Sequence, residues 1–182
     1  VSERSHNARI FGPLGHALDV AEPDAIVVGT GPGSYTGIRI GISAAAGLAA
    51  VRGIPMVGLC SLLGLADEAG RPVNDACVVG DARRGQVWMA EISGREVGVA
   101  PRPMSAVEAL PRCAGTRTVT PDAVCPPGLE DCPVETVAPS AAQLATRVGR
   151  LGEEEFDALA SGDVAPIYLA APFVTKPRKI GK

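Results

Sequence analysis

The chain has 182 residues, of which 46% are hydrophobic and 20% are charged, with a formal net charge of -3. This length suits one compact domain or two small lobes, and no apolar run approaches the roughly eighteen residues that a membrane span needs. The weakly acidic charge and the 3% aromatic content exclude a basic surface rich in stacking rings, so we expect poor nucleic-acid binding by the chain alone. The sequence also lacks a signal-peptide pattern, so we expect a soluble, cytoplasmic protein.

The first predicted element is an amphipathic helix over residues 5–19. Its apolar residues share one helical face, and they are Ile10, Phe11, Leu14, Ala17 and Leu18. Pro13 interrupts this pattern, and because a proline inside a helix loses a hydrogen bond, we expect a kinked or late-starting helix. Residues 25–29 follow as a short β-branched run between turn formers, which predicts a buried strand.

A second helix is predicted over residues 36–52, and it is apolar on nearly every side. A helix of this kind must be covered on more than one face. Its small residues recur every four positions, at Gly37, Gly41, Ala45 and Ala49, and they form a low ridge that another helix could approach closely. Either a partner protein or the sheet and first helix of this chain could supply the cover, and the sequence favours neither.

The remaining elements change in character along the chain. We expect a strand at residues 56–59 and a helix from Ser61 to about residue 69, and this alternation predicts parallel strands. A hairpin follows, with strands at 77–81 and 86–92 and Arg83-Arg84-Gly85 at its turn, and then a strand at 97–100. Residues 101–139 are rich in proline and glycine, with a short helix after Ser105. Ser140 caps a helix that reaches residue 151, and another is expected at 153–159.

These elements suggest a first lobe over residues 1–72 and a second lobe over 73–182, which includes the C-terminal helices and a basic tail at 176–182. Three helices in the first lobe need a sheet to pack on, and two parallel strands are too small a platform. Either a partner completes the sheet or strands are absent from this sequence, and we expect that strands of the first lobe are missing from its N-terminal side.

A glycine-rich turn connects the first strand to the second helix. The unpaired amides at a helix start carry partial positive charge, so this turn is a candidate anion site, formed by Gly31, Gly33, Ser34 and Thr36. The pattern matches neither nucleotide-binding glycine motif, because Ile38 and Arg39 follow Gly37 and the glycine spacing differs. A turn that only packs tightly is the commoner explanation of such a loose match.

The stretch from Val28 to Gly41, V-G-T-G-P-G-S-Y-T-G-I-R-I-G, resembles the signature of the TsaB (YeaZ) family. Residues 81–88, D-A-R-R-G-Q-V-W, resemble the hairpin motif of that family, and residues 53–55 and 61–62 resemble its pattern around the second strand. Residues 166–169, P-I-Y-L, match its closing motif, although Ala170 stands where arginine is common.

This resemblance implies an α/β protein of the actin-like (ASKHA, ribonuclease H-like) fold with two lobes, in which the opening strands of the first lobe are missing. It also implies a non-catalytic subunit that supports a TsaD-type threonylcarbamoyl transferase in making threonylcarbamoyladenosine in tRNA. Further partners would be a TsaE-type ATPase and a second copy of the chain, with tRNA reached only through the complex and no membrane. No cofactor is expected, except ATP or ADP at the complex interface.

In this family the partners meet through the first two helices of each protein. Carried over to this sequence, the expected interface residues are Ile10, Leu14, Ala17, Leu18, Ile38, Gly41, Ile42, Ala45 and Ala49.

Two other functions are alternatives to the role of a non-catalytic subunit. A glycoprotease-like hydrolase, with or without metal, would need metal ligands or a nucleophile with a base. His6 and His16 are too far apart for ligands on adjacent turns, and no Cys-x-x-Cys pair exists among the five cysteines. We therefore expect no metal site, no catalytic residues, and free, mostly buried thiols. An autonomous nucleotide-binding, ATPase-like protein would use the glycine-rich turn.

Overall fold

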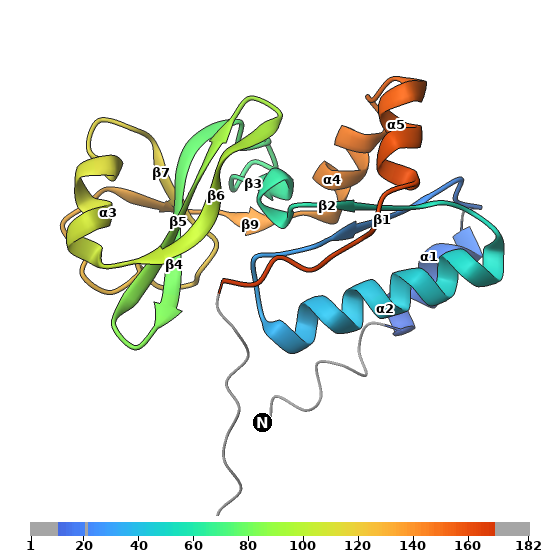
Figure 1. Cartoon of the computed structure of the whole chain (residues 1–182), viewed down its shortest axis with the longest axis horizontal. Coiled ribbons are helices and arrows are strands. Elements are labelled where there is room, and N and C mark those ends of the chain that lie inside the picture. Colours follow the sequence, from blue (N-terminus) through green and yellow to red (C-terminus); the bar gives the residue numbers. More distant parts are fainter. Residues whose placement is uncertain (1–10, 21, 170–182) are drawn as a thin grey trace, which may run out of the picture.

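The computed structural model describes residues 11–20 and 22–169. Ile10 and the basic tail at 176–182 therefore lie outside the described residues. The described chain forms two lobes side by side, one built on a two-stranded sheet and the other on a five-stranded sheet (Figure 1). No helix among the described residues is long and apolar enough to cross a membrane.

The first four elements of the first lobe follow the expected order of helices and strands. Helix α1 (Phe11–Val20) precedes strand β1 (Ile26–Gly29), helix α2 (Tyr35–Arg52) and strand β2 (Met56–Leu59), and the two strands pair in parallel. Ser34 caps α2 by accepting a hydrogen bond from the amide of Gly37 at 3.3 Å. Gly53 ends the helix in the left-handed conformation, with φ of 65°, which a glycine adopts without strain. The described residues give this sheet two strands only.

The C-terminal helices belong to the first lobe, which corrects the expected division at residue 72. Helix α4 (Ala141–Val148) packs on β1 and helix α5 (Glu153–Ala160) packs on β2, whereas α2 covers the opposite face of the sheet (Figure 1). The physical reason is that a parallel sheet is normally covered on both faces, and here the residues of the two strands are mostly half-buried. Leu144 of α4 is buried in this layer.

The second lobe is a five-stranded sheet with the order β6-β5-β4-β7-β8. Strands β4 (Asp75–Arg83), β5 (Gln86–Ser93) and β6 (Glu96–Met104) are antiparallel, and the predicted hairpin turn is confirmed. Strands β7 (Thr118–Thr120) and β8 (Val134–Thr136) come from the segment that the sequence left unassigned. Helix α3 (Ala106–Cys113) starts with a capping box between Ser105 and Glu108. Apolar side chains fill a core on each face of the sheet.

The helix predicted from Ser61 to residue 69 is wrong. A single 3₁₀ turn, η3 (Ser61–Gly64), is followed by strand β3 (Leu65–Ala66), which pairs with β9 (Ala138–Pro139). The side chain of Asp67 then closes a turn by accepting from the amides of Ala69 and Arg71. Pairing with a strand about seventy residues away outweighs the local helix signal, as tertiary context commonly does.

Candidate interaction surface

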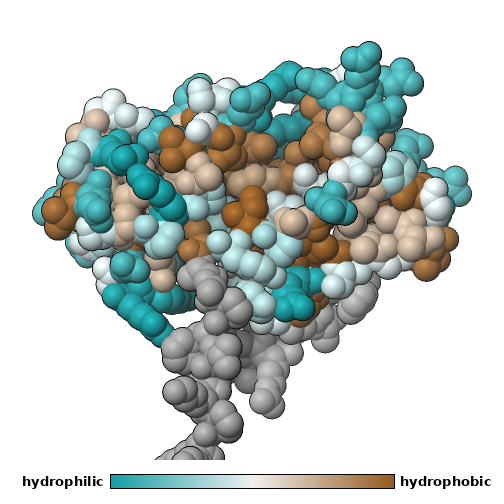
Figure 2. Space-filling view, in the orientation of Figure 1, coloured by the Kyte–Doolittle hydropathy of each residue, from teal (hydrophilic) through white to brown (hydrophobic). Residues whose placement is uncertain are grey.

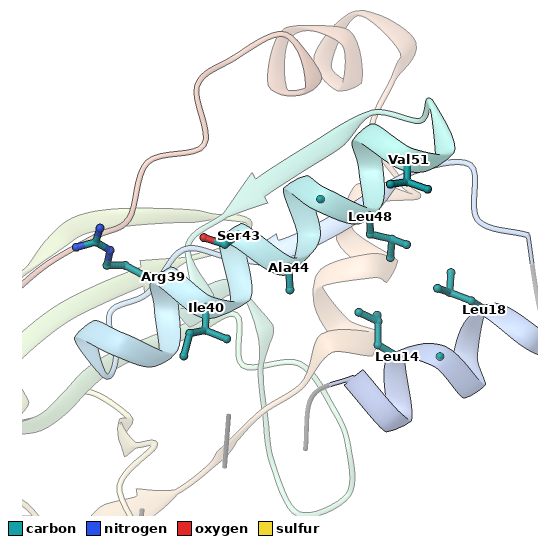
Figure 3. A pocket seen from close by; sticks show the side chains of 10 residues that line it. Leu14, Leu18, Arg39, Ile40, Ser43, Ala44, Leu48 and Val51 are labelled. Carbon is teal, nitrogen blue, oxygen red and sulfur yellow. The ribbon is translucent and has the colours of Figure 1, made fainter. Parts of the chain in front are cut away.

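An apolar groove runs between α1 and α2 on the outside of the first lobe. Its volume is about 740 Å³, and it is lined by Leu14, Gly15, Leu18, Arg39, Ile40, Ser43, Ala44, Gly47, Leu48 and Val51. The side chains of Leu14 and Leu18 point toward those of Leu48 and Val51 across the groove (Figure 3). Arg39 lies at the far end of α2 and extends away from α1 (Figure 3). The lining is therefore apolar, with its charge at one end.

Large apolar side chains remain open to solvent beside this groove. Val51 at the end of α2 is 86% exposed, and Val20 at the end of α1 is 73% exposed. Figure 2 shows mostly apolar surface over the C-terminal half of α2, at the right of the molecule. Contiguous exposed apolar surface next to a groove is typical of a protein-interaction site.

The opposite face of α2 packs against the chain's own sheet. Ile38, Ala45 and Ala49 are each at most 8% exposed, and α2 contacts β1 and β2. These three residues are core residues of this chain, which corrects their expected place at a partner interface. A Cβ built on Gly41 would meet no atom of the described residues within 4 Å, so none of them packs closely on the expected small-residue ridge at that position.

The other expected interface residues are spread over both sides of the helix pair. Leu14 and Leu18 line the groove, and Ala17 is exposed on α1. Gly41 and Ile42 are half-buried on α2 and do not line the groove. The groove residues of α2 that the sequence reasoning missed are Ile40, Ala44, Leu48 and Val51. Their spacing of i, i+4, i+8 and i+11 marks one helical face and could have identified them.

Several polar groups of the glycine-rich turn form hydrogen bonds with other residues of the chain. The amide of Gly31 donates to Oγ of Ser61 at 2.9 Å, and its carbonyl accepts from the amide of Ser61 at 2.8 Å. Gly31 has φ of 104°, and a Cβ there would lie 2.8 Å from the carbonyl oxygen of Ile167. Ser34 is engaged as the helix cap, whereas Gly33 and Thr36 are exposed. Close packing thus explains the glycine at position 31 without an anion.

The segment with the closing motif returns to this turn. The amide of Ile167 donates to the carbonyl of Thr30 at 2.7 Å. The ring of Tyr168 stacks on that of Tyr35, with 4.6 Å between centroids, and the guanidinium of Arg39 lies 5.4 Å from the centroid of Tyr35. The structure therefore joins two motif segments that lie more than 130 residues apart, which sequence reasoning had not foreseen.

The cysteines have the properties of structural thiols. Cys77 and Cys113 are buried, with 3.9 Å between their sulfur atoms, and the other three are half-buried. Burial, together with the neighbouring Cys113, raises the pKa of Cys77 to about 12, so this thiol stays protonated at neutral pH. Within residues 11–20 and 22–169, no group of three or more His, Cys, Asp or Glu side chains could hold a metal ion.

Comparison with known proteins identifies the family. The family model of TsaD, tRNA N6-adenosine threonylcarbamoyltransferase, matches residues 5–110, which is more than half of the chain. The TsaB protein of Escherichia coli, named for tRNA threonylcarbamoyladenosine biosynthesis, is 37% identical over 103 residues, which are 53% of this chain and 45% of that protein. An uncharacterized protein of Mycobacterium leprae is 35% identical over 167 residues, which are 88% of this chain and 40% of that protein. The chain spans less than half the length of these relatives.

The fold is also shared with solved structures. YeaZ from Pseudomonas aeruginosa matches with a TM-score of 0.62 at 21% identity, over 90% of this chain and 85% of that chain. A second structure from the same organism, described as similar to peptidase YeaZ, matches equally well at 22% identity, over 91% of this chain and 84% of that one. The expected actin-like α/β fold is thus confirmed. The chain belongs to the family that the TsaD model describes and, within it, to the TsaB (YeaZ) proteins.

Proposed function

We propose that this chain is a non-catalytic subunit that binds a TsaD-type threonylcarbamoyl transferase and supports it in making threonylcarbamoyladenosine in tRNA. The observation that carries the proposal is the open apolar groove between α1 and α2 in a member of this family. The names of the matched TsaB proteins supply the pathway.

The occupant of the groove would be the corresponding helix pair of the transferase. The groove is long enough to involve residues from both ends of α2, because Ile40 and Val51 both line it. Burying a Leu or Val side chain contributes about 1.5–3 kcal/mol, so a few such side chains supply most of the energy of a stable contact. The protonated thiol of Cys77 and the structural role of Ser34 favour the adaptor over a hydrolase.

The test is a matched pair of substitutions on α2. Ala44 is half-buried and lines the groove, whereas Ala50 is exposed and lies outside it. Ala44→Arg places a charge and a long side chain in the groove, and we expect affinity for a co-expressed TsaD-type protein to fall at least about tenfold. Ala50→Arg introduces the same side chain into the same helix and should leave binding unchanged.

Co-elution in size-exclusion chromatography and calorimetric titration would measure both variants, and far-UV circular dichroism would show that both are folded. Equal binding by the two variants would refute the groove as the interface. Ala45→Arg is unsuitable for this purpose, because Ala45 is buried against the chain's own sheet and a charge there would unfold the lobe.

The wider assembly follows from the same proposal. A TsaE-type ATPase would join the pair, ATP or ADP would bind only where subunits meet, and tRNA would be reached through the complex in the cytoplasm. A second copy of the chain could fill the groove when the transferase is absent. Light scattering of the isolated chain would then report a dimer, and Ala44→Arg would convert it to a monomer.

A further inference from the structure

A second cavity lies on the other side of the first lobe, between α5 and the turn that joins β5 to β6. Its volume is about 470 Å³, which lies within the range of small-molecule sites. Its lining comes from both lobes and consists of Leu59, Leu63, Arg95, Glu96, Arg147, Leu151, Glu155, Ala158 and Leu159. We refer to the four leucines of this lining as the leucine floor, and the charged side chains come from both lobes.

The cavity lining includes Arg147, which is half-buried. Its guanidinium donates to the carbonyl of Leu63, to Oδ1 of Asn74 at 3.0 Å and to the carbonyls of Val73 and Gly94, each at 3.5 Å. All of these acceptors are neutral. Among the described residues, none of the three ion pairs includes Arg147, so its charge has no carboxylate partner.

Further positive charges lie near Arg147. Burial and the nearby charges of Arg95 and Arg150 lower the pKa of Arg147, which means that its local environment disfavours a cation. The carboxylate of Glu155 accepts a hydrogen bond from the amide of Gly152 at the start of α5. Glu96 also lines the cavity but forms no ion pair within 4 Å with a described residue.

We propose that this cavity binds a small amphipathic anion, which has an apolar body and a single carboxylate, sulfonate or phosphate group. The apolar body would lie on the leucine floor, while the anionic group would pair with Arg147 and Arg95. Such a ligand supplies the countercharge that the guanidinium lacks, and charge-assisted hydrogen bonds to an anion are stronger than those to neutral acceptors.

Two fluorescent probes that differ by one group test the proposal on the full chain. 8-Anilinonaphthalene-1-sulfonate carries a sulfonate, and N-phenyl-1-naphthylamine is its neutral counterpart. We expect the sulfonate probe to bind at least about tenfold more tightly than the neutral probe, because the sulfonate adds a charge-assisted hydrogen bond to a guanidinium of the cavity. Equal affinities of the two probes would overturn the proposal.

Three variants locate the binding. Arg95 is exposed at the cavity edge, so Arg95→Gln should not affect folding, and it should weaken sulfonate binding about fivefold while changing the neutral probe less than about twofold. Ala158→Trp should fill the cavity and weaken both probes. Arg39→Gln is the control, because Arg39 lines the α1–α2 groove.

The outcomes separate the two sites. If Arg39→Gln removes the sulfonate preference and Arg95→Gln does not, the anion binds in the groove and the proposal is wrong. The proposal is also wrong if Arg95→Gln and Ala158→Trp both bind as the unmodified chain does. Loss of sulfonate preference in Arg95→Gln alone, with normal circular dichroism, supports it.

Discussion

Gly80 in β4 and Trp88 in β5 form a directly opposed pair in the antiparallel hairpin. Trp88 is 5% exposed and is the only tryptophan in the chain. Its indole covers the glycine so closely that a Cβ built at position 80 would lie 2.5 Å from Cζ2 of the ring. Gly80→Ala therefore requires the ring to move, and the ring is packed within the buried cluster that includes Val78 and Leu144.

The expected cost of Gly80→Ala follows from the size of this displacement. Ordinary contacts of a Cβ begin near 3.4 Å, so the ring must shift by almost 1 Å in a close-packed core. Overpacking of this kind costs about 1–3 kcal/mol, and alanine recovers a few tenths of that through its better strand propensity. We expect a loss of about 2 kcal/mol, or about 4–8 °C in Tm for a chain of this size.

Urea unfolding followed by the fluorescence of Trp88 measures this loss, since the probe is the residue that moves. Gly98→Ala is the matched control, because a Cβ at Gly98 on β6 would lie 3.8 Å from the nearest atom, an ordinary contact. It should change the free energy of unfolding by less than about 0.5 kcal/mol. If both variants have the same stability, the argument from ring packing is refuted.

Two further predictions concern polar groups in the interior. Arg147→Met removes the hydrogen bonds that join α4 to both lobes, whose acceptors are in Leu63, Val73, Asn74 and Gly94. Because the guanidinium is partly exposed, we expect the free energy of unfolding in urea to fall by only about 2 kcal/mol. An unchanged midpoint of urea unfolding would contradict this role. The pKa of Cys77 is raised to about 12 in the folded state, above its unfolded value of about 8.5. The buried, protonated thiol therefore contributes fully to the free energy of unfolding below the unfolded pKa, and this contribution is lost as pH rises toward 12. At pH 8 the thiol should react with an aromatic disulfide reagent only as fast as the chain opens, and rapid stoichiometric labelling of Cys77 in the folded chain would contradict this.

The sequence predicted correctly those elements whose ends depend on interactions between residues close together in the chain. Strand β2 has the bounds expected from its sequence, and the caps at Ser105 and Ser140 start α3 and α4 where they were expected. At each cap the decisive hydrogen bond joins residues three positions apart, as between Ser140 and Gln143. The hairpin turn was also predictable, because Gly85 has a φ of 73° that a glycine adopts readily.

Ser61 shows why the predicted helix that followed it does not form. A serine before an apolar run is a common helix start, yet Oγ of Ser61 accepts from the amide of Gly31, thirty residues earlier. The next residues, Leu65 and Ala66, pair with β9. Both interactions depend on distant parts of the chain, and no local pattern carries that information.

The same limit explains the interface residues. An all-round apolar helix predicts two covered faces, but the sequence cannot say which face meets the chain's own sheet. The small-residue ridge suggested the face of Ala45 and Ala49, and these two residues are buried inside the chain. Ala45 and Ala49 let α2 pack on the sheet of its own lobe, and this leaves the face of Ala44 and Leu48 directed toward the groove.

This arrangement also separates the two proposed binding surfaces. The α1–α2 groove and the cavity beside α5 lie on opposite faces of the β1–β2 sheet, because α2 covers one face and α4 and α5 cover the other (Figure 1). A helix pair bound in the groove would therefore not obstruct an anion near Arg147. We expect a partner-bound chain to keep its preference for the sulfonate probe, and loss of that preference on adding the transferase would show that the two surfaces overlap or are coupled.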